Sequence, residues 1–291
     1  MEKELRVSID RIWIVYPLSN PSEFSGLLTS LWSNAGEPGV KIKSVKYTTT
    51  ATLPLALGQS LVVTAGMAQK FCYGKYDFKP ADLTDEGWER LFVELGYRLD
   101  FGYASLLTSG YVNYLEIAVD VKPVVAKDLL PFDSKIRTSK WWPSFADPTP
   151  TAYLGTRLSD RGFRVYDRVA RLKKLGVEID GPIARIEATV RRSKCSILNL
   201  ASIPNPFATF GVCRFEDLDA FDGGDFWKTF LMHCRESGSA HALALAGPMR
   251  KKYLGYLSQL CCEWWNSNEI WSMYPKALEA LIPPPSVKTV F

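Results

Sequence analysis

The sequence of 291 residues is 47% hydrophobic and 13% aromatic, which is enough for packed cores and excludes a disordered chain. Its formal net charge is only +4, and no apolar run approaches the roughly 20 residues that span a bilayer. The charged start, MEKELRVSID, has no apolar signal region, so we expect a cytoplasmic protein without a membrane partner.

The first part of the chain is predicted to be rich in strands, because β-branched and aromatic residues alternate with polar ones. In the first strand this alternation groups Asp10 with Ile12 and Ile14, opposite Arg11 and Trp13. The expected elements are a strand at 7–17, a helix at 21–32, strands at 45–55 and 60–68, a helix at 84–101 that Thr84 caps, and a strand at 114–121.

The pattern weakens between residues 122 and 150, a segment that contains Trp141 and Trp142 beside Lys140 and Arg137. Exposed tryptophans next to cations form a platform for stacking on unpaired bases. The two rings can equally cover the core beneath a loop. Both interpretations stay open from the sequence.

Positive charge is concentrated between residues 157 and 194, where eleven Lys and Arg residues face five acids, a local net charge of +6. The rest of the chain therefore carries −2. The segment also holds two predicted strands and a short basic helix. A basic segment with tyrosine and arginine in an otherwise nearly neutral chain indicates a surface that binds nucleic acid.

Strand periodicity predicts a polar sheet face that gathers acids, cations and a phenol. In GFRVYD, Arg164 and Tyr166 point the same way, and in PIARIEATVRR the polar side contains Glu187. In YLEIAVDV, Glu116 and Asp120 share a side. Carboxylates gathered on one face are ligands for a hard divalent cation, which relieves their mutual repulsion. The alternative is an inert polar face in which the acids pair with Arg185 and Arg191.

Three blocks of the sequence, YLEIAVDV, TAYLGTRLSDRGFRVYDR and IARIEATVRR, resemble the rolling-circle replication initiation factors. This family includes Rep proteins of plasmids and replication proteins of filamentous phages. The resemblance spans residues 114–192, in the family's order and spacing. Arg168 stands where the family usually has Lys, and Glu116 where Asp is common; both keep the charge.

The resemblance implies an α+β fold of the HUH/Rep-nickase kind, with a central antiparallel sheet, helices on one face and a helical C-terminal region. Residues 1–200 would form the nicking domain and residues 201–291 a helical subdomain. Those C-terminal helices either pack on the sheet or serve contacts in a homodimer. The family also implies a bacterial host.

The resemblance further implies a nickase that starts rolling-circle replication at an origin. Tyr166 would be the nucleophile that forms a 5′-phosphotyrosyl intermediate, with Tyr153 as the second candidate. Arg164 and Arg168 would lower the phenol pKa and stabilise the transition state. A Mg²⁺ or Mn²⁺ ion would be held by Glu116, Asp120 and Glu187.

The implied partners are origin DNA, single-stranded or as a hairpin, and a host helicase and polymerase that use the free 3′-OH. Because the bond energy is kept in the phosphotyrosine, no ATP is needed, and no GxxxxGK[ST] loop is present. The predicted DNA-binding residues are Arg157, Arg161, Arg171, Lys173, Lys174, Arg185, Arg191, Trp141 and Trp142.

Six cysteines form no CxxC pair, and neither His233 nor His241 lies in a His-hydrophobe-His strand. We therefore expect free thiols and a metal held by carboxylates alone, without zinc. Two other functions stay open. One is a DNA-binding repressor or origin-recognition protein without catalysis, and the other is a metal-dependent nuclease that cuts through water.

Overall fold

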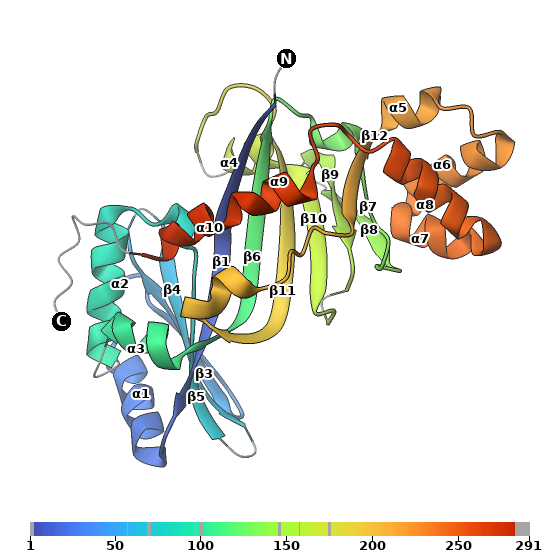
Figure 1. Cartoon of the computed structure of the whole chain (residues 1–291). Coiled ribbons are helices and arrows are strands. Elements are labelled where there is room, and N and C mark those ends of the chain that lie inside the picture. The colour runs from blue at the N-terminus through green and yellow to red at the C-terminus, as the bar shows by residue number, and fades with distance from the viewer. Residues whose placement is uncertain are drawn as a thin grey trace. The chain divides into compact units, whose positions relative to one another are not determined.

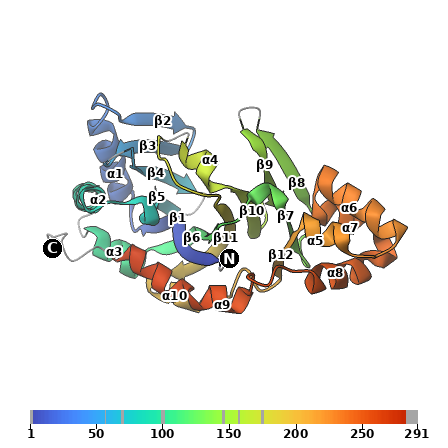
Figure 2. The same ribbon diagram turned by 90° about the horizontal axis from the view of Figure 1, so that it is seen from above.

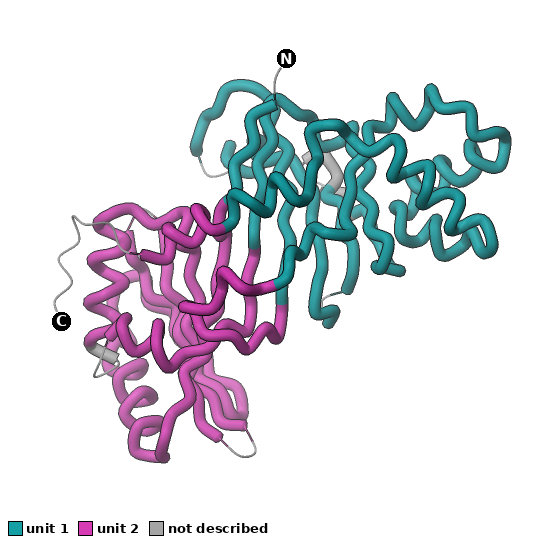
Figure 3. The backbone as a smooth tube through the Cα atoms, viewed as in Figure 1, with its two compact units in different colours: residues 1–7, 117–190, 204–274 teal, residues 8–116, 191–203, 275–291 magenta. Residues whose placement is uncertain are grey.

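The computed structural model has mixed α and β structure, with one large antiparallel sheet and helices packed beside it (Figure 1). It describes residues 3–56, 58–68, 71–98, 102–144, 147–156, 158–173 and 176–282. Two compact units divide the chain. Unit 1 comprises residues 1–7, 117–190 and 204–274, and unit 2 comprises residues 8–116, 191–203 and 275–291 (Figure 3).

The large sheet has the strand order β2-β3-β4-β5-β1-β6-β11-β10-β9-β8, and β12 pairs with β7 in a small second sheet. Neighbours among β2, β3, β4, β5 and β1, and among β8, β9, β10 and β11, pair antiparallel. The strands are β1 Glu4–Leu18, β2 Lys41–Val45, β3 Thr48–Pro54, β4 Ser60–Ala68, β5 Phe71–Phe78, β6 Tyr111–Lys122, β7 Leu129–Asp133, β8 Ser139–Ser144, β9 Asp147–Leu154, β10 Arg161–Asp167, β11 Ala184–Ser196 and β12 Phe210–Arg214.

Unit 2 packs its helices on one side of its strands (Figures 1 and 2). Asn20 accepts a hydrogen bond from the Glu23 amide and caps the first helix, and Thr84 caps the second by accepting from the Gly87 amide. The helix expected at 84–101 ends earlier, and a second helix begins at Gly102. These helices are α1 Pro21–Ser33, α2 Asp85–Arg98 and α3 Gly102–Ser109.

In unit 1 the predicted strand–turn–strand is the hairpin of β9 and β10, followed directly by the short helix α4 (Arg168–Lys173). Gly155 turns the chain with φ +86°, and a Cβ there would lie 3.0 Å from the Arg161 carbonyl oxygen. Only glycine suits that backbone at such close approach. Strands that the sequence did not predict, β7 and β8, occupy much of the segment at 122–150.

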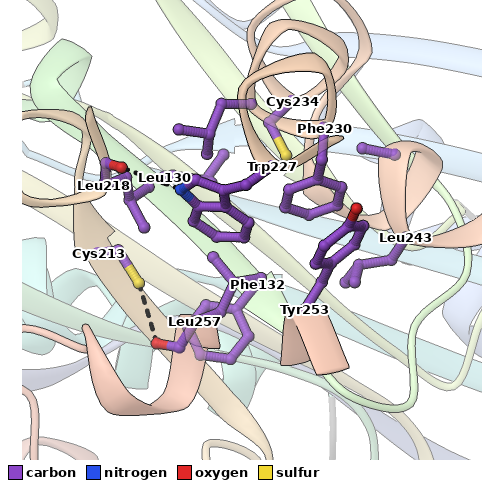
Figure 4. Packing of buried hydrophobic residues seen from close by; sticks show 12 residues of the cluster. Leu130, Phe132, Cys213, Leu218, Trp227, Phe230, Cys234, Leu243, Tyr253 and Leu257 are labelled. Carbon is purple, nitrogen blue, oxygen red and sulfur yellow. Dashed lines mark hydrogen bonds between the residues drawn. The ribbon is translucent and has the colours of Figure 1, made fainter. Parts of the chain in front are cut away.

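The helices after residue 214 enclose a core of their own within unit 1 (Figure 4). Trp227 lies at its centre, packed against Phe230 and Tyr253, and its indole nitrogen donates to the Leu218 carbonyl. Phe132 of β7 and Cys213 of β12 belong to the same core, so these helices pack on the small sheet. They are α5 Phe215–Ala220, α6 Asp225–Ser237, α7 Ser239–Leu245 and α8 Arg250–Gln259, followed by α9 Ser267–Ser272 and α10 Tyr274–Ala277.

All six cysteines are free thiols, as expected. Burial raises the pKa of the Cys262 thiol to about 12 and that of Cys213 and Cys234 further. Among the described helices, none combines the length and the apolar character needed to span a membrane.

Candidate active site

A row of polar residues crosses four strands of unit 1 on one face of the sheet. Glu187 of β11 lies opposite Arg164 of β10, Arg164 opposite Tyr153 of β9, and Tyr153 opposite Lys140 of β8. Directly opposed residues share a face, so these four side chains lie on one side. Tyr166 lies two residues beyond Arg164 on the same side, as the alternation predicts.

The Tyr166 hydroxyl is held in a hydrogen-bonded cluster at the end of this row. It donates to Glu187 Oε1 at 2.5 Å and accepts from Arg171 Nη1 at 2.7 Å. The Arg171 guanidinium also lies over the phenol ring, 5.3 Å from its centroid. Arg164 forms an ion pair with Glu187 through Nη2 and Oε2. The two oxygens of one buried carboxylate thus contact both the phenol and Arg164.

Burial dominates the electrostatics of the phenol, since Tyr166 is only 7% exposed. The pKa of Tyr166 is raised well above its usual value, first by burial and then by the negative charge of Glu187; Arg185 and Arg171 act against this. In this state the phenol is a hydrogen-bond donor and stays protonated at neutral pH. Arg185 and Arg171 lower the phenol pKa in the structure, and the effect expected of Arg164 and Arg168 stays a prediction.

Three buried carboxylates form a group with the spacing of metal ligands. Asp10 lies on β1, Glu116 on β6 and Glu187 on β11, and one oxygen from each lies within 4.8 Å of the others. Carboxylate oxygens are the donors that hard cations such as Mg²⁺ and Mn²⁺ prefer, and a cation offsets the cost of burying several negative charges together. The donor set therefore fits a divalent metal. Glu116 also accepts a hydrogen bond from the Tyr114 hydroxyl.

Asp120, which the sequence predicted as a metal ligand, is not in this group. Both of its carboxylate oxygens accept from Arg185, through Nε and Nη2, at 2.6 Å each. Arg185 is 4% exposed and Asp120 is partly exposed, so the pair is a bidentate ion pair with a buried guanidinium. For Asp120 and Arg185, the structure matches the alternative of a paired polar face. The third carboxylate of the group is Asp10. Strict alternation placed its side chain on the same strand face as Ile12 and Ile14, so the sequence did not predict it as a ligand.

Most of the cations predicted to bind DNA have other contacts. Arg161 donates to both oxygens of Asp133, which is fully buried, and to the Pro206 carbonyl. Arg171 contacts Tyr166, and Arg185 contacts Asp120. Arg191 lies over the Tyr114 ring, 5.3 Å from its centroid.

The remaining predicted cations lie on or near the hairpin and α4. Lys173 is exposed on α4. Arg168 begins that helix, where its amide donates to the Ile183 carbonyl. Arg157 and Lys174 lie outside the described residues.

Trp141 packs against the core of α5–α8, and its indole nitrogen donates to the Cys234 carbonyl at 2.8 Å. This placement favours the core interpretation over base stacking. Trp142 pairs with Thr151 through the backbone, and its side chain is outside the described part of the structure. Tyr153, the second candidate nucleophile, is partly buried and opposite Arg164.

The chain is similar to a solved rolling circle replication initiator protein from Geobacillus stearothermophilus, with a TM-score of 0.43 and 12% identity over 81% of this chain and 98% of that one. It also overlaps DynU16, from the dynemicin biosynthetic locus, with a TM-score of 0.19 and 11% identity over 81% of this chain and 97% of that one. Similarities with TM-scores this low carry no argument about function. No protein-family profile matches the sequence, and no curated protein does.

Proposed function

We propose that this protein nicks one strand of origin DNA through Tyr166 and a divalent metal, and so initiates rolling-circle replication. The observation that carries the proposal is the hydrogen bond from the Tyr166 hydroxyl to Glu187, a carboxylate that also belongs to the group of three. It joins a nucleophile to a proton acceptor beside a metal-binding donor set. The three sequence blocks that resemble the replication initiators contain Tyr166, Glu187 and Glu116, whereas Asp10 lies outside them.

The proposed chemistry begins with the phenolic proton, which already points at Glu187 Oε1. As the proton moves to this oxygen, Arg171 Nη1 remains hydrogen-bonded to the phenolate oxygen and stabilises its charge. The phenolate oxygen then bonds to the scissile phosphorus, and the bond from phosphorus to the 3′-oxygen breaks. That oxygen takes a proton and becomes the free 3′-OH. The products are a 5′-phosphotyrosyl protein and a primer end for a polymerase.

The metal would be held by Asp10, Glu116 and Glu187. A bound Mg²⁺ or Mn²⁺ supplies a Lewis acid that neutralises charge on the phosphate oxygens. The protein's own contribution is to keep Glu187 oriented between Tyr166 and Arg164, which fixes the proton acceptor without help from solvent.

A hydrolytic metal-dependent nuclease is a second candidate, because one observation favours it. Tyr166 is buried, and its pKa is raised by that burial, which is the state of a structural phenol more than of an exposed nucleophile. In such an enzyme the carboxylate group would serve a water nucleophile, and Tyr166 would only orient Glu187.

The two candidates differ in whether the protein becomes attached to DNA. The test incubates the protein and Mn²⁺ with a single-stranded oligonucleotide that covers its own origin, and separates the products on a denaturing gel. The matched variant is Tyr166→Phe, which removes only the hydroxyl. We expect an adduct from the parent and none from the variant.

An adduct that survives in Tyr166→Phe would assign the nucleophile to Tyr153. Cleavage without an adduct would overturn the phosphotyrosyl proposal in favour of the nuclease. Binding without cleavage would favour the non-catalytic repressor or origin-recognition protein.

A further inference from the structure

A second concentration of positive charge lies in unit 2, far in sequence from the basic segment around Tyr166. Residues 38–79 contain six lysines and a single acid, Asp77, which gives this segment a net charge of +5. Asp77 is occupied by Arg11, which binds it through two hydrogen bonds of 2.7 and 2.8 Å. The lysines are therefore not neutralised within their own segment.

The strands of this segment have one face that α1 covers and an opposite face, uncovered by α1, that is exposed at Lys41 and Lys43 and buried at Thr64 and Asp77. The covered face carries the apolar residues Ala51, Leu61, Val63 and Tyr76, all fully buried, and α1 packs against β3, β4 and β5. The strand register places a different set on the opposite face. That set comprises Lys41, Lys43, Val45, Thr48, Thr50, Thr52, Val62, Thr64, Gly66, Tyr73, Lys75 and Asp77.

This uncovered face has a polar floor with cations at both ends. One row runs from Lys43 through Thr50 and Thr64 to Lys75, and the two threonine hydroxyls in its middle are hydrogen-bonded at 3.0 Å. Lys43 is exposed and Lys75 partly buried. Thr50 is partly exposed and Thr64 is buried, so the accessible part of the row is Lys43, Thr50 and the partly exposed Lys75, whose two cations suit a polymer that carries negative charge along its length.

Aromatic rings lie on the same face. Tyr73 lies over Gly66, where a Cβ would come 2.3 Å from the ring, so glycine is what lets the ring lie flat on the neighbouring strand. Lys75 Nζ is 4.5 Å from the centre of the Trp13 ring. Tyr73 and Trp13 are both partly exposed. Rings that alternate with cations suit a chain whose bases are unpaired, because every base offers a face for stacking.

The aromatic line ends at the candidate active site. Trp13 stacks on Tyr114 with their centroids 4.1 Å apart, and the Tyr114 hydroxyl donates to Glu116, one of the three grouped carboxylates. The pKa of Lys75 is lowered by burial, and the charge of Arg11 adds to this while Asp77 opposes it. A phosphate beside Lys75 would favour the charged form of the ammonium and offset the cost of its burial, so the position suits an anion.

We propose that the uncovered face of β1–β5 is a track for single-stranded DNA, in which Lys43 and Lys75 bind phosphates while Tyr73 stacks on a base. Trp13, held between Tyr114 and Lys75, fixes the position of the Lys75 ammonium. The identity of the strand as origin DNA rests on the proposed nicking function.

The test measures binding of a labelled oligothymidylate of about 16 nucleotides by fluorescence anisotropy, in EDTA and in a Tyr166→Phe background, so that cleavage plays no part. The test variant is Lys43→Gln/Lys75→Gln. Glutamine keeps much of the stem that packs on Trp13. The matched control, Lys127→Gln/Lys228→Gln, removes the same charge from exposed positions elsewhere.

We expect the test variant to bind at least tenfold more weakly than the control. The slope of the logarithm of its binding constant against the logarithm of the salt concentration should be shallower by about 1.4, since each single-strand phosphate contact contributes about 0.7. Tyr73→Ala should weaken binding about tenfold, whereas Tyr73→Phe should not. Equal affinities and salt slopes for test variant and control would overturn the track, and so would a parent that does not bind the oligonucleotide.

Adduct formation separates the track from the nicking function. If the test variant loses binding but the parent forms no adduct on origin DNA, the track stands and the nicking proposal fails. If the parent forms an adduct and the test variant binds like its control, nicking stands and the track fails.

Discussion

The Tyr166 hydroxyl donates a 2.5 Å hydrogen bond to Glu187 across neighbouring antiparallel strands. Glu187 stands opposite Arg164 in the register, two residues from Tyr166, so phenol, carboxylate and guanidinium meet on one face. The contact has two consequences. It gives the phenolic proton an acceptor, and it places a negative charge that keeps the proton on the phenol until that charge is offset.

This buried phenol makes stability depend on pH in a definite direction. Because the pKa of Tyr166 is higher in the folded protein than the value near 10 expected when unfolded, its contribution is fully present below about pH 10. Above that pH the unfolded state loses the proton first, so the parent's free energy of unfolding should fall relative to Tyr166→Phe by up to about 1.4 kcal/mol per pH unit. Urea denaturation of both proteins between about pH 8 and 11 measures this difference.

Tyr103 is buried as well and its pKa is also raised, but it is present in both proteins and cancels in the comparison. Parallel curves for the parent and Tyr166→Phe across this range would show that Tyr166 is exposed in solution.

The ion pair of Asp120 and Arg185 predicts a loss of stability on substitution. Asp120→Asn removes the charge that both of these Arg185 hydrogen bonds meet, so we expect a loss of about 1.5–3 kcal/mol in the free energy of unfolding. Asp219→Asn breaks the ion pair between Asp219 and Arg235. Both side chains are substantially exposed, so the loss in the free energy of unfolding should be less than about 1 kcal/mol. Similar losses for the two variants, measured by urea denaturation, would contradict the buried pair.

Metal binding should separate Asp10 from Asp120. We expect Asp10→Asn and Glu116→Gln to weaken Mn²⁺ binding by about tenfold or more, because each removes an anionic ligand. Asp120→Asn should bind Mn²⁺ like the parent at temperatures where it is folded. The electron paramagnetic resonance signal of free Mn²⁺ reports this without any need for activity. Loss of affinity in Asp120→Asn alone would restore the ligand set that the sequence suggested.

Trp141 should affect stability and not DNA affinity. Trp141→Phe removes the hydrogen bond to the Cys234 carbonyl, which still accepts from the Gly238 amide, so the loss should be about 0.5–1.5 kcal/mol in the free energy of unfolding. Trp32→Phe, at a side chain that is 52% exposed, is the control and should change stability by less than about 0.5 kcal/mol. A Trp141→Phe protein with normal stability and weakened binding to single-stranded DNA would reinstate base stacking.

Periodicity predicted the face of the site but not the partners on it. A two-residue repeat fixes which side of a strand Tyr166, Arg164 and Glu187 occupy, and the structure places them together there. Which cation pairs with which acid depends on register between strands, which the repeat does not encode. Asp120 and Glu187 are equivalent by pattern, yet Asp120 accepts hydrogen bonds from Arg185 and Glu187 accepts one from Tyr166.

Two features of the site were beyond the reach of alternation. Asp10 is a single acid in a strand that reads as apolar on its side, and only the three-dimensional structure brings it near Glu116. Arg171 lies five residues after Tyr166, and its contact depends on α4 turning back beside β10. The lysines of β2 and β5 were likewise missed, because their shared face is set by the pairing of four strands.

The most direct test of the central claim is to locate the DNA on the protein. After reaction with Mn²⁺ and an origin oligonucleotide, the protein is digested with nuclease and protease, and the peptides are sequenced by tandem mass spectrometry. We predict a nucleotide linked through phosphate to Tyr166, in the peptide that contains GFRVYD. A nucleotide on Tyr153, or cleaved DNA with unmodified Tyr166, would contradict it.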